Sequence, residues 1–200
     1  MTTIKTSHLF EKLIKEWNNK INLISRKDVE NFEVNHLLHS LSISKFIEFK
    51  KDTKILDLGT GGGLPGIPLS IVFPDSKFKL IDRKNKKINV LNKIISELGI
   101  NNASAQSIDI IDSNHNYDFI VNRAVSSADN LIKLCKGKIN YKGENKIKNG
   151  IICLKGGNLN SELKNIDKFK IVELKTFFSE QFFETKKILY IPNPYSHMDS

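Results

Sequence analysis

The residues that hold together many small proteins are scarce in this 200-residue chain. It has two cysteines, Cys135 and Cys153, and five scattered histidines. Two distant cysteines exclude a disulfide framework, and no cysteine and histidine spacing matches a zinc site, so we expect no metal. No apolar run approaches the ~20 residues of a membrane-spanning helix, and residues 1–8 hold no signal-peptide core. These absences predict a cytoplasmic protein without a membrane partner.

Arginine is scarce as well, although the chain is strongly basic. Only Arg26, Arg83 and Arg123 are arginines among 31 basic residues, which outnumber 22 acidic ones and give a formal net charge of +9. Such a charge attracts polyanions, nucleic acid above all. The same mixture of lysine, asparagine and isoleucine also arises from the codon bias of an AT-rich genome, and composition leaves both explanations open. The lysine-rich stretch 136–149 is likewise either a solvated loop or an RNA-facing edge.

Apolar spacing predicts one α/β domain behind a helical preface. In residues 1–50 apolar side chains recur every three or four positions, and the second such run extends from Val29 to Phe49. From Thr53 onward short apolar runs alternate with amphipathic stretches, the pattern of a mostly parallel sheet wrapped by helices. Seven strands are expected at 54–58, 78–82, 103–106, 117–122, 150–154, 169–177 and 187–191, with the last two adjacent and antiparallel. Helices are expected near 68–72, 84–98, 127–136 and 159–166.

Glycines crowd the segment that follows the first expected strand, which runs Asp-Leu-Gly-Thr-Gly-Gly-Gly-Leu-Pro-Gly over residues 57–66. Glycine after a strand lets the backbone turn sharply and approach a ligand. Gly59 and Gly61 are therefore candidate contacts to a nucleotide-like cofactor. A literal G-x-G-x-x-G spans Gly61 to Gly66, so a nicotinamide-dependent oxidoreductase is an alternative.

Two acidic residues stand at the ends of neighbouring strands, and the first of them, Asp57, discriminates between a dinucleotide and S-adenosylmethionine. Asp57 stands where a dinucleotide would bring its pyrophosphate, which a carboxylate repels, whereas S-adenosylmethionine brings an ammonium and a sulfonium. Asp82 is placed to accept hydrogen bonds from ribose hydroxyls, as either nucleotide requires. The competing interpretation makes both residues helix caps or solvated turn residues.

The next strand ends complete the expected pocket, because ligands of parallel sheets lie outside the carboxyl ends of the strands. Ile108 and Asp109 could cover an adenine. Arg123 stands at the end of the fourth strand, where a ligand or phosphate would lie; pairing with Asp57 or Asp109 is its alternative. Arg123 is the candidate for a catalytic role.

Several methyl-transfer chemistries lack their residues. The position after the fourth strand reads Asn122-Arg-Ala-Val rather than the Asn-Pro-Pro-Tyr type that grips an exocyclic amine. Cys153 lies in an apolar strand, where a thiol is more often an inert core residue than a nucleophile. A ring nitrogen such as guanine N7 has a free lone pair and needs no general base, so the missing base is compatible with that acceptor.

The glycine segment, continued as Leu-Pro-Gly-Ile-Pro over residues 64–68, resembles the cofactor loop of the glucose-inhibited division protein B family, the guanine-N7 methyltransferases of small-subunit (16S) ribosomal RNA. Similar segments follow the family order, at Trp17-Asn18 with 21–25, at 36–40, 122–125 and 154–156. The resemblance covers residues 10–191. It implies a Rossmann-like class I methyltransferase over residues 51–192, a helical extension over 1–50, a tail over 193–200, and S-adenosylmethionine as cofactor.

By this resemblance Gly59, Leu64, Ile108, Asp109 and Arg123 contact the cofactor, with Asp82 on its ribose. Ribosomal RNA or the small subunit is the expected partner of a monomeric enzyme, and the RNA-binding candidates are Arg26, His36 and Lys155. The chain departs from the family at His39, where an acidic residue is expected, and at Arg83, Ser107 and Ile108. The extension before Trp17 is also short. A non-catalytic RNA-binding assembly factor and the oxidoreductase remain the alternatives.

Overall fold

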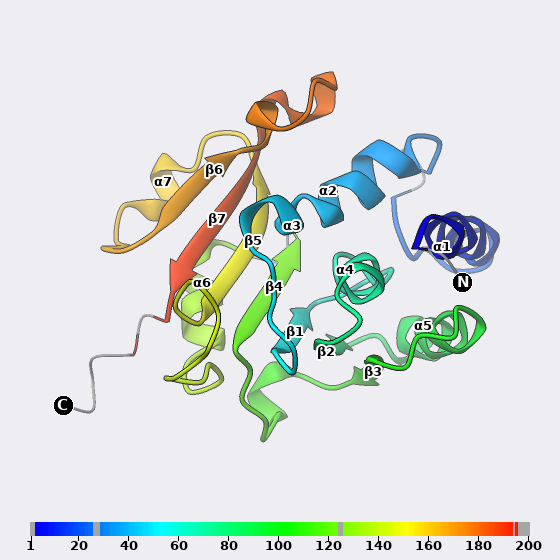
Figure 1. The fold of residues 1–200 in the computed structure, drawn as a ribbon, viewed down its shortest axis with the longest axis horizontal. Coiled ribbons are helices and arrows are strands. Elements are labelled where there is room, and N and C mark those ends of the chain that lie inside the picture. Colours follow the sequence, from blue (N-terminus) through cyan, green and yellow to red (C-terminus); the bar gives the residue numbers. More distant parts are fainter. Residues whose placement is uncertain (1–2, 26–28, 124–125, 194, 196–200) are drawn as a thin grey trace.

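A single sheet of seven strands lies at the centre of the computed structural model, which describes residues 3–25, 29–123, 126–193 and 195. The strand order is β3-β2-β1-β4-β5-β7-β6, and only β7 runs antiparallel to its neighbours. This confirms the predicted mostly parallel sheet with an antiparallel last pair (Figure 1). The strands are β1 Lys54–Leu58, β2 Lys77–Asp82, β3 Ala103–Ser107, β4 Phe119–Arg123, β5 Gly150–Gly156, β6 Lys170–Glu173 and β7 Lys186–Pro192.

Helices cover both faces of the sheet because successive strand residues point to opposite sides. In β1, Ile55 joins an apolar cluster with the helices α4 (Gly66–Val72) and α5 (Asn85–Glu97). Leu56 joins a second cluster, on the other face, with α6 (Ala128–Leu134) and α7 (Asn160–Leu163). Both side chains have no exposed surface. No helix of the described residues is long and apolar enough to cross a membrane.

The helical preface adds a further layer over α4 and α5 (Figure 1). Its first helix, α1 (Thr3–Asn18), buries Phe10 and Ile14 in the same cluster as β1's Ile55. The second predicted helical run becomes a π-helical turn η2 (Glu33–Leu38) followed by α2 (His39–Leu41) and α3 (Ile43–Phe46). It stops before the expected Phe49 because Ile47 is extended, with φ −142° and ψ 140°.

The strand predicted over residues 169–177 is shorter in the structure. β6 ends at Glu173, and the chain then turns through the 3-10 helix η4 (Leu174–Thr176), where the amides of Phe177 and Phe178 both donate to the carbonyl of Leu174. Apolar composition predicted a strand here, but β6 is an edge strand whose pairing with β7 ends at Glu173. A second 3-10 helix, η5 (Gln181–Thr185), then leads into β7.

The lysine-rich stretch 136–149 lies where β5 begins, at the amino ends of the strands. Asp118 fastens it, since its Oδ1 accepts hydrogen bonds from the side chains of Asn140 and Asn149, and its Oδ2 accepts one from the amide of Lys54. The stretch therefore lies at the edge of the sheet opposite the glycine loop, which follows the carboxyl end of β1.

Candidate functional site

The glycine loop between β1 and α4 is confined on two sides. Its backbone has positive φ at Gly59, Gly61 and Gly63. A Cβ on Gly66 would lie 2.7 Å from Oδ2 of Asp57, and one on Gly62 would lie 3.0 Å from Cγ2 of Ile24 in the preface. Both distances are too short for a side chain without movement, so these glycines serve the close packing of the loop.

Asp57 lies beneath this loop with no exposed surface. Its Oδ2 accepts hydrogen bonds from the hydroxyl of Thr60 at 2.6 Å and from the amide of Gly66 at 2.8 Å. Its Oδ1 has no hydrogen-bond partner among the described residues. Burial raises the pKa of Asp57 to about 6, against the lowering effect of the two hydrogen bonds and of the Arg123 charge. The carboxylate thus shapes the loop, and a contact with a cofactor stays a prediction.

Four of the predicted cofactor residues, Asp82 among them, line one cavity of about 350 Å³ at the carboxyl ends of β1, β2 and β3. The two oxygens of Asp82 accept the amides of Lys84, at 2.9 Å, and Gly61, at 3.1 Å. Asp82 therefore fixes the glycine loop to the start of α5 and keeps further lone pairs for a ligand. The predicted residues brought together around it are Gly59, Ile108 and Asp109.

Asp109 pairs with Arg83 rather than with Arg123. The carboxylate and guanidinium are 2.6 Å apart, and Asp109 also caps the 3-10 helix η3 (Ile110–Asp112) by accepting the amide of Ile111. Leu64, another predicted contact, is 2% exposed in the apolar cluster, and its side chain lines neither this cavity nor the next.

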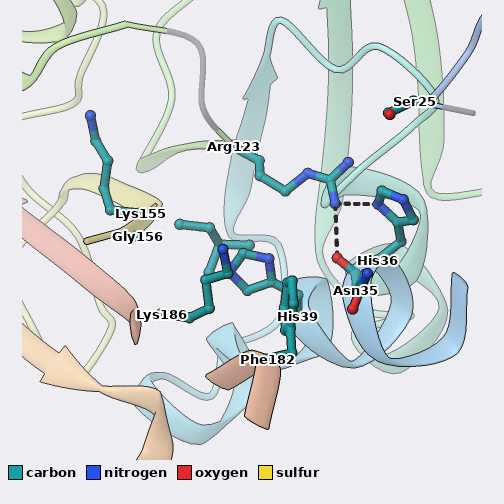
Figure 2. Close-up of a pocket in the computed structure, with 10 residues that line it drawn as sticks. Ser25, Asn35, His36, His39, Arg123, Lys155, Gly156, Phe182 and Lys186 are labelled. Atoms are coloured by element: carbon teal, nitrogen blue, oxygen red, sulfur yellow. Dashed lines mark hydrogen bonds between the residues drawn. The ribbon is translucent and has the colours of Figure 1, made fainter. Parts of the chain in front are cut away.

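Arg123 lines a second cavity of about 550 Å³, at the carboxyl ends of β4 and β5. Figure 2 shows its guanidinium directed at η2, where it donates to the carbonyl of Asn35 at 3.4 Å and meets Nδ1 of His36 at 2.6 Å. A guanidinium only donates, so Nδ1 of His36 is the acceptor and a neutral His36 carries its proton on Nε2. Two residues predicted for different roles, Arg123 and His36, thus form one unit.

The same cavity is walled by residues that were not predicted as site residues, including His39, Phe182 and Lys186. The ring of His39 meets that of Phe182 edge to face, with centroids 5.3 Å apart. Burial, with Arg123, Lys186 and His36 as nearby positive or ionisable groups, lowers the pKa of His39 to about 3. His39 is therefore neutral at any physiological pH. The sequence could have indicated His39 as a site residue, because it lies in the segment 36–40 that resembles the family. No sequence pattern indicated Lys186.

Lys155, predicted to bind RNA, is occupied within the protein. Its ammonium donates to the carbonyl of Ser126 and to Oε2 of Glu162, both at 2.7 Å, and its side chain is 9% exposed. Glu162 also accepts the amide of Ala128 at the start of α6. This pair joins β5, α6 and α7, and Figure 2 shows the amine pointing away from Arg123. Arg26, the other predicted RNA contact, lies outside the described residues.

With this geometry established, comparison with known proteins assigns the family. The family model described as GidB, rRNA small subunit methyltransferase G, matches residues 3–188. The chain belongs to this family. A small-subunit methyltransferase G from Christiangramia forsetii is 47% identical over 185 residues, which are 92% of this chain and 88% of that one. The Bacteroides thetaiotaomicron protein of the same name is 47% identical over 176 residues, covering 88% and 85% of the two chains.

Solved structures confirm the fold of this family member. A variant of MtNAS in complex with S-adenosylmethionine superposes with a TM-score of 0.60 at 15% identity, over 94% of this chain and 75% of that one. Precorrin-6y C5,15-methyltransferase from Geobacter metallireducens gives 0.56 at 12% identity, over 85% and 90%. The expected class I methyltransferase fold and the resemblance seen in the sequence segments are thus both confirmed. The oxidoreductase and the non-catalytic assembly factor are not favoured.

Proposed function

We propose that this protein transfers the methyl group of S-adenosylmethionine to N7 of a guanosine in small-subunit ribosomal RNA. Membership in the methyltransferase G family over residues 3–188 is the observation that carries the proposal. Two cavities lie at one edge of the sheet, and they suit a methyl donor and a methyl acceptor. The smaller cavity lies at the end of β1 and the larger at the end of β4, and these two strands are paired. S-adenosylmethionine supplies an electrophilic methyl group on a sulfonium.

The residues around the smaller cavity fit this cofactor. Asp82 offers carboxylate lone pairs to ribose hydroxyls, and Ile108 offers an apolar wall to the adenine. Asp57 lies beneath the glycine loop, outside the lining of this cavity, and its Oδ1 lacks a partner among the described residues. A buried carboxylate there favours a cationic ligand over a pyrophosphate. Gly59 leaves the turn free of a side chain. Asp109, which Arg83 holds in the lining of this cavity, is proposed as a further contact to the cofactor.

N7 is proposed as the acceptor because the two histidines that line the larger cavity are poor candidates for a general base. His39, with a pKa of about 3, is a poor proton acceptor. The Nδ1 of His36 is occupied by Arg123. N7 has a lone pair and needs no deprotonation before attack, so the residues need only align the nucleotide with the methyl group. Orientation of this kind can supply about 7 to 11 kcal/mol of barrier lowering. Arg123, which lines the larger cavity, is the proposed positioning cation.

We further propose that the extension of residues 1–50 serves the RNA and residues 51–192 the chemistry. The extension covers the glycine loop through Leu23 and Ile24, whose amides both donate to Oδ1 of Asn18. The same extension contributes Asn35 and His36 to the acceptor cavity. RNA bound there would therefore touch the element that packs against the cofactor loop.

Nucleoside analysis tests the proposal. Small subunits from cells lacking the protein are incubated with purified protein and S-adenosylmethionine carrying a labelled methyl group, digested, and analysed by mass spectrometry. Label in 7-methylguanosine at one mapped position is the expected result. Label in another nucleoside would contradict N7 as the acceptor. RNA binding without incorporation would instead support the assembly-factor alternative.

A further inference from the structure

We propose that Lys186, at the corner between η5 and β7, binds a phosphate of the RNA strand next to the nucleotide that accepts the methyl group. The proposal rests on the proposed function, since it makes the larger cavity the acceptor site. It adds Lys186, a cation at the start of the last strand, to that site. This residue is far in sequence from the glycine loop. Three lysines, Lys155, Lys186 and Lys187, lie at this end of β5 and β7.

Two of these lysines are neutralised by carboxylates. Lys155 pairs with Glu162 at 2.7 Å, and Lys187, opposite it in the ladder, pairs with Glu173 at 2.9 Å. Lys186 points to the other face of β7, as successive strand residues do. Among the described residues no carboxylate lies within ion-pair distance of Lys186. Its charge is therefore left for a ligand.

The surroundings of Lys186 hold its ammonium at the cavity wall. Nζ lies 4.6 Å from the ring centroid of Phe182, a cation–π contact that orients the amine without neutralising it. Gly156, its partner in the ladder, leaves room for the amine, since a Cβ there would lie 3.3 Å from Nζ. An aromatic ring on one side and a bare backbone on the other thus keep the charge accessible from the cavity.

The rest of the cavity suits an anion. Its described lining contains no acidic residue, and besides Lys186 its cations are Arg123 and Lys155, of which Lys155 is already paired with Glu162. His39 stays neutral among these charges, and its Nε2 is buried without a hydrogen-bond partner among the described residues. A volume of about 550 Å³ with such a wall can take one nucleotide with its phosphate. Enzymes that modify a base generally extrude it from the stack into such a pocket.

Salt dependence separates a phosphate contact from a structural role. The affinity of a fluorescent RNA fragment containing the mapped guanosine is measured by anisotropy over a range of KCl for wild type, Lys186→Met, Lys186→Arg and Lys187→Met. Removing one phosphate contact should lower the magnitude of the log–log slope by about 0.7 to 0.9 and weaken binding about tenfold at low salt. Lys186→Arg should keep the wild-type slope. Lys187→Met removes the same charge one residue away, on the opposite face of β7, and should also keep the wild-type slope.

In methyl transfer, Lys186→Met should raise KM for RNA while kcat changes less than twofold. An unchanged slope in Lys186→Met, or an equal loss in Lys187→Met, would overturn the proposal. Because binding is measured without turnover, the salt slope would still test Lys186 if the protein proved to methylate a different nucleoside. Thermal unfolding of each variant shows whether it is folded. If Lys186→Met does not fold, the slope of Lys186→Gln replaces it, and a wild-type slope there would equally overturn the proposal.

Discussion

Replacing His39 by leucine should change how the stability of this protein responds to acid. His39 is 5% exposed, and its pKa is lowered from 6.5 to about 3 by burial and then by the charges of Arg123 and Lys186 and by His36. Between these two values the unfolded chain binds a proton that the folded chain does not. The free energy of unfolding therefore falls as the pH decreases from 6.5, by about 1.4 kcal/mol per pH unit.

Asp57 works in the opposite direction over part of the same range. Its pKa is raised from 3.8 to about 6, so between these values the folded chain holds a proton that the unfolded chain has released. The free energy of unfolding consequently rises as the pH decreases from 6, again by about 1.4 kcal/mol per unit. From pH 6.5 to 5 the loss at His39 is about 2 kcal/mol and the gain at Asp57 about 1 kcal/mol. The two contributions oppose each other in the wild-type protein.

The His39→Leu variant removes one side of this balance. Urea unfolding followed by circular dichroism at pH 6.5 and at pH 5 gives the change in free energy for each protein. On acidification the free energy of unfolding of the variant should rise relative to that of the wild type by about 2 kcal/mol. Contributions of unaltered groups cancel in this comparison. Equal pH responses of the two proteins would refute the assignment of a neutral, buried His39.

Three further predictions concern the cofactor loop and the β5 clamp, the pair of Lys155 and Glu162. Burial holds the pKa of Asp57 near 6, so calorimetry should show that S-adenosylmethionine binds more tightly as the pH rises from 5 toward 6, and Asp57→Asn should abolish this pH dependence. A pH dependence that persists in the variant would mean that another group causes it. Gly66→Ala should destabilise the fold by about 1 to 3 kcal/mol in urea unfolding, since its Cβ would lie 2.7 Å from Oδ2 of Asp57, and unchanged stability would disprove this packing. Glu162→Gln leaves the ammonium of Lys155 uncompensated at 9% exposure and should cost about 2 kcal/mol, against less than about 1 kcal/mol for the matched, more exposed Glu173→Gln; equal costs would contradict the clamp.

The sheet was predictable because its signal is local. Short apolar runs separated by amphipathic stretches located all seven strands, and the glycine segment after β1 located the loop on which the cofactor proposal rests. The prediction was wrong where pairing rather than composition decides, as at Phe177, which belongs to an apolar run but lies beyond the last pair of β6 with β7. The helical run ended early at Ile47 for a comparable reason, since packing into the core fixes its extended backbone.

Roles of charged side chains depended on partners that no local pattern reveals. Arg123 could equally have paired with Asp57 or Asp109; the structure gives Asp109 to Arg83 and turns Arg123 to His36. Lys155 is predicted to bind RNA, and the structure shows its ammonium paired with Glu162. A pair forms only where two backbones bring the groups within a few ångströms, and that distance is set by strand order and helix placement.

By itself, the sequence determined the fold class, the family and the position of the cofactor loop, because these follow from apolar periodicity and from a continuous run of residues. Only the tertiary structure decided which cations line the larger cavity. It set Lys186 beside Arg123 through the antiparallel return of β7, 63 positions further along the chain, and it buried the charge of Lys155 against Glu162. The surplus of positive charge is a property of composition, whereas the part of it available to RNA is a property of the fold.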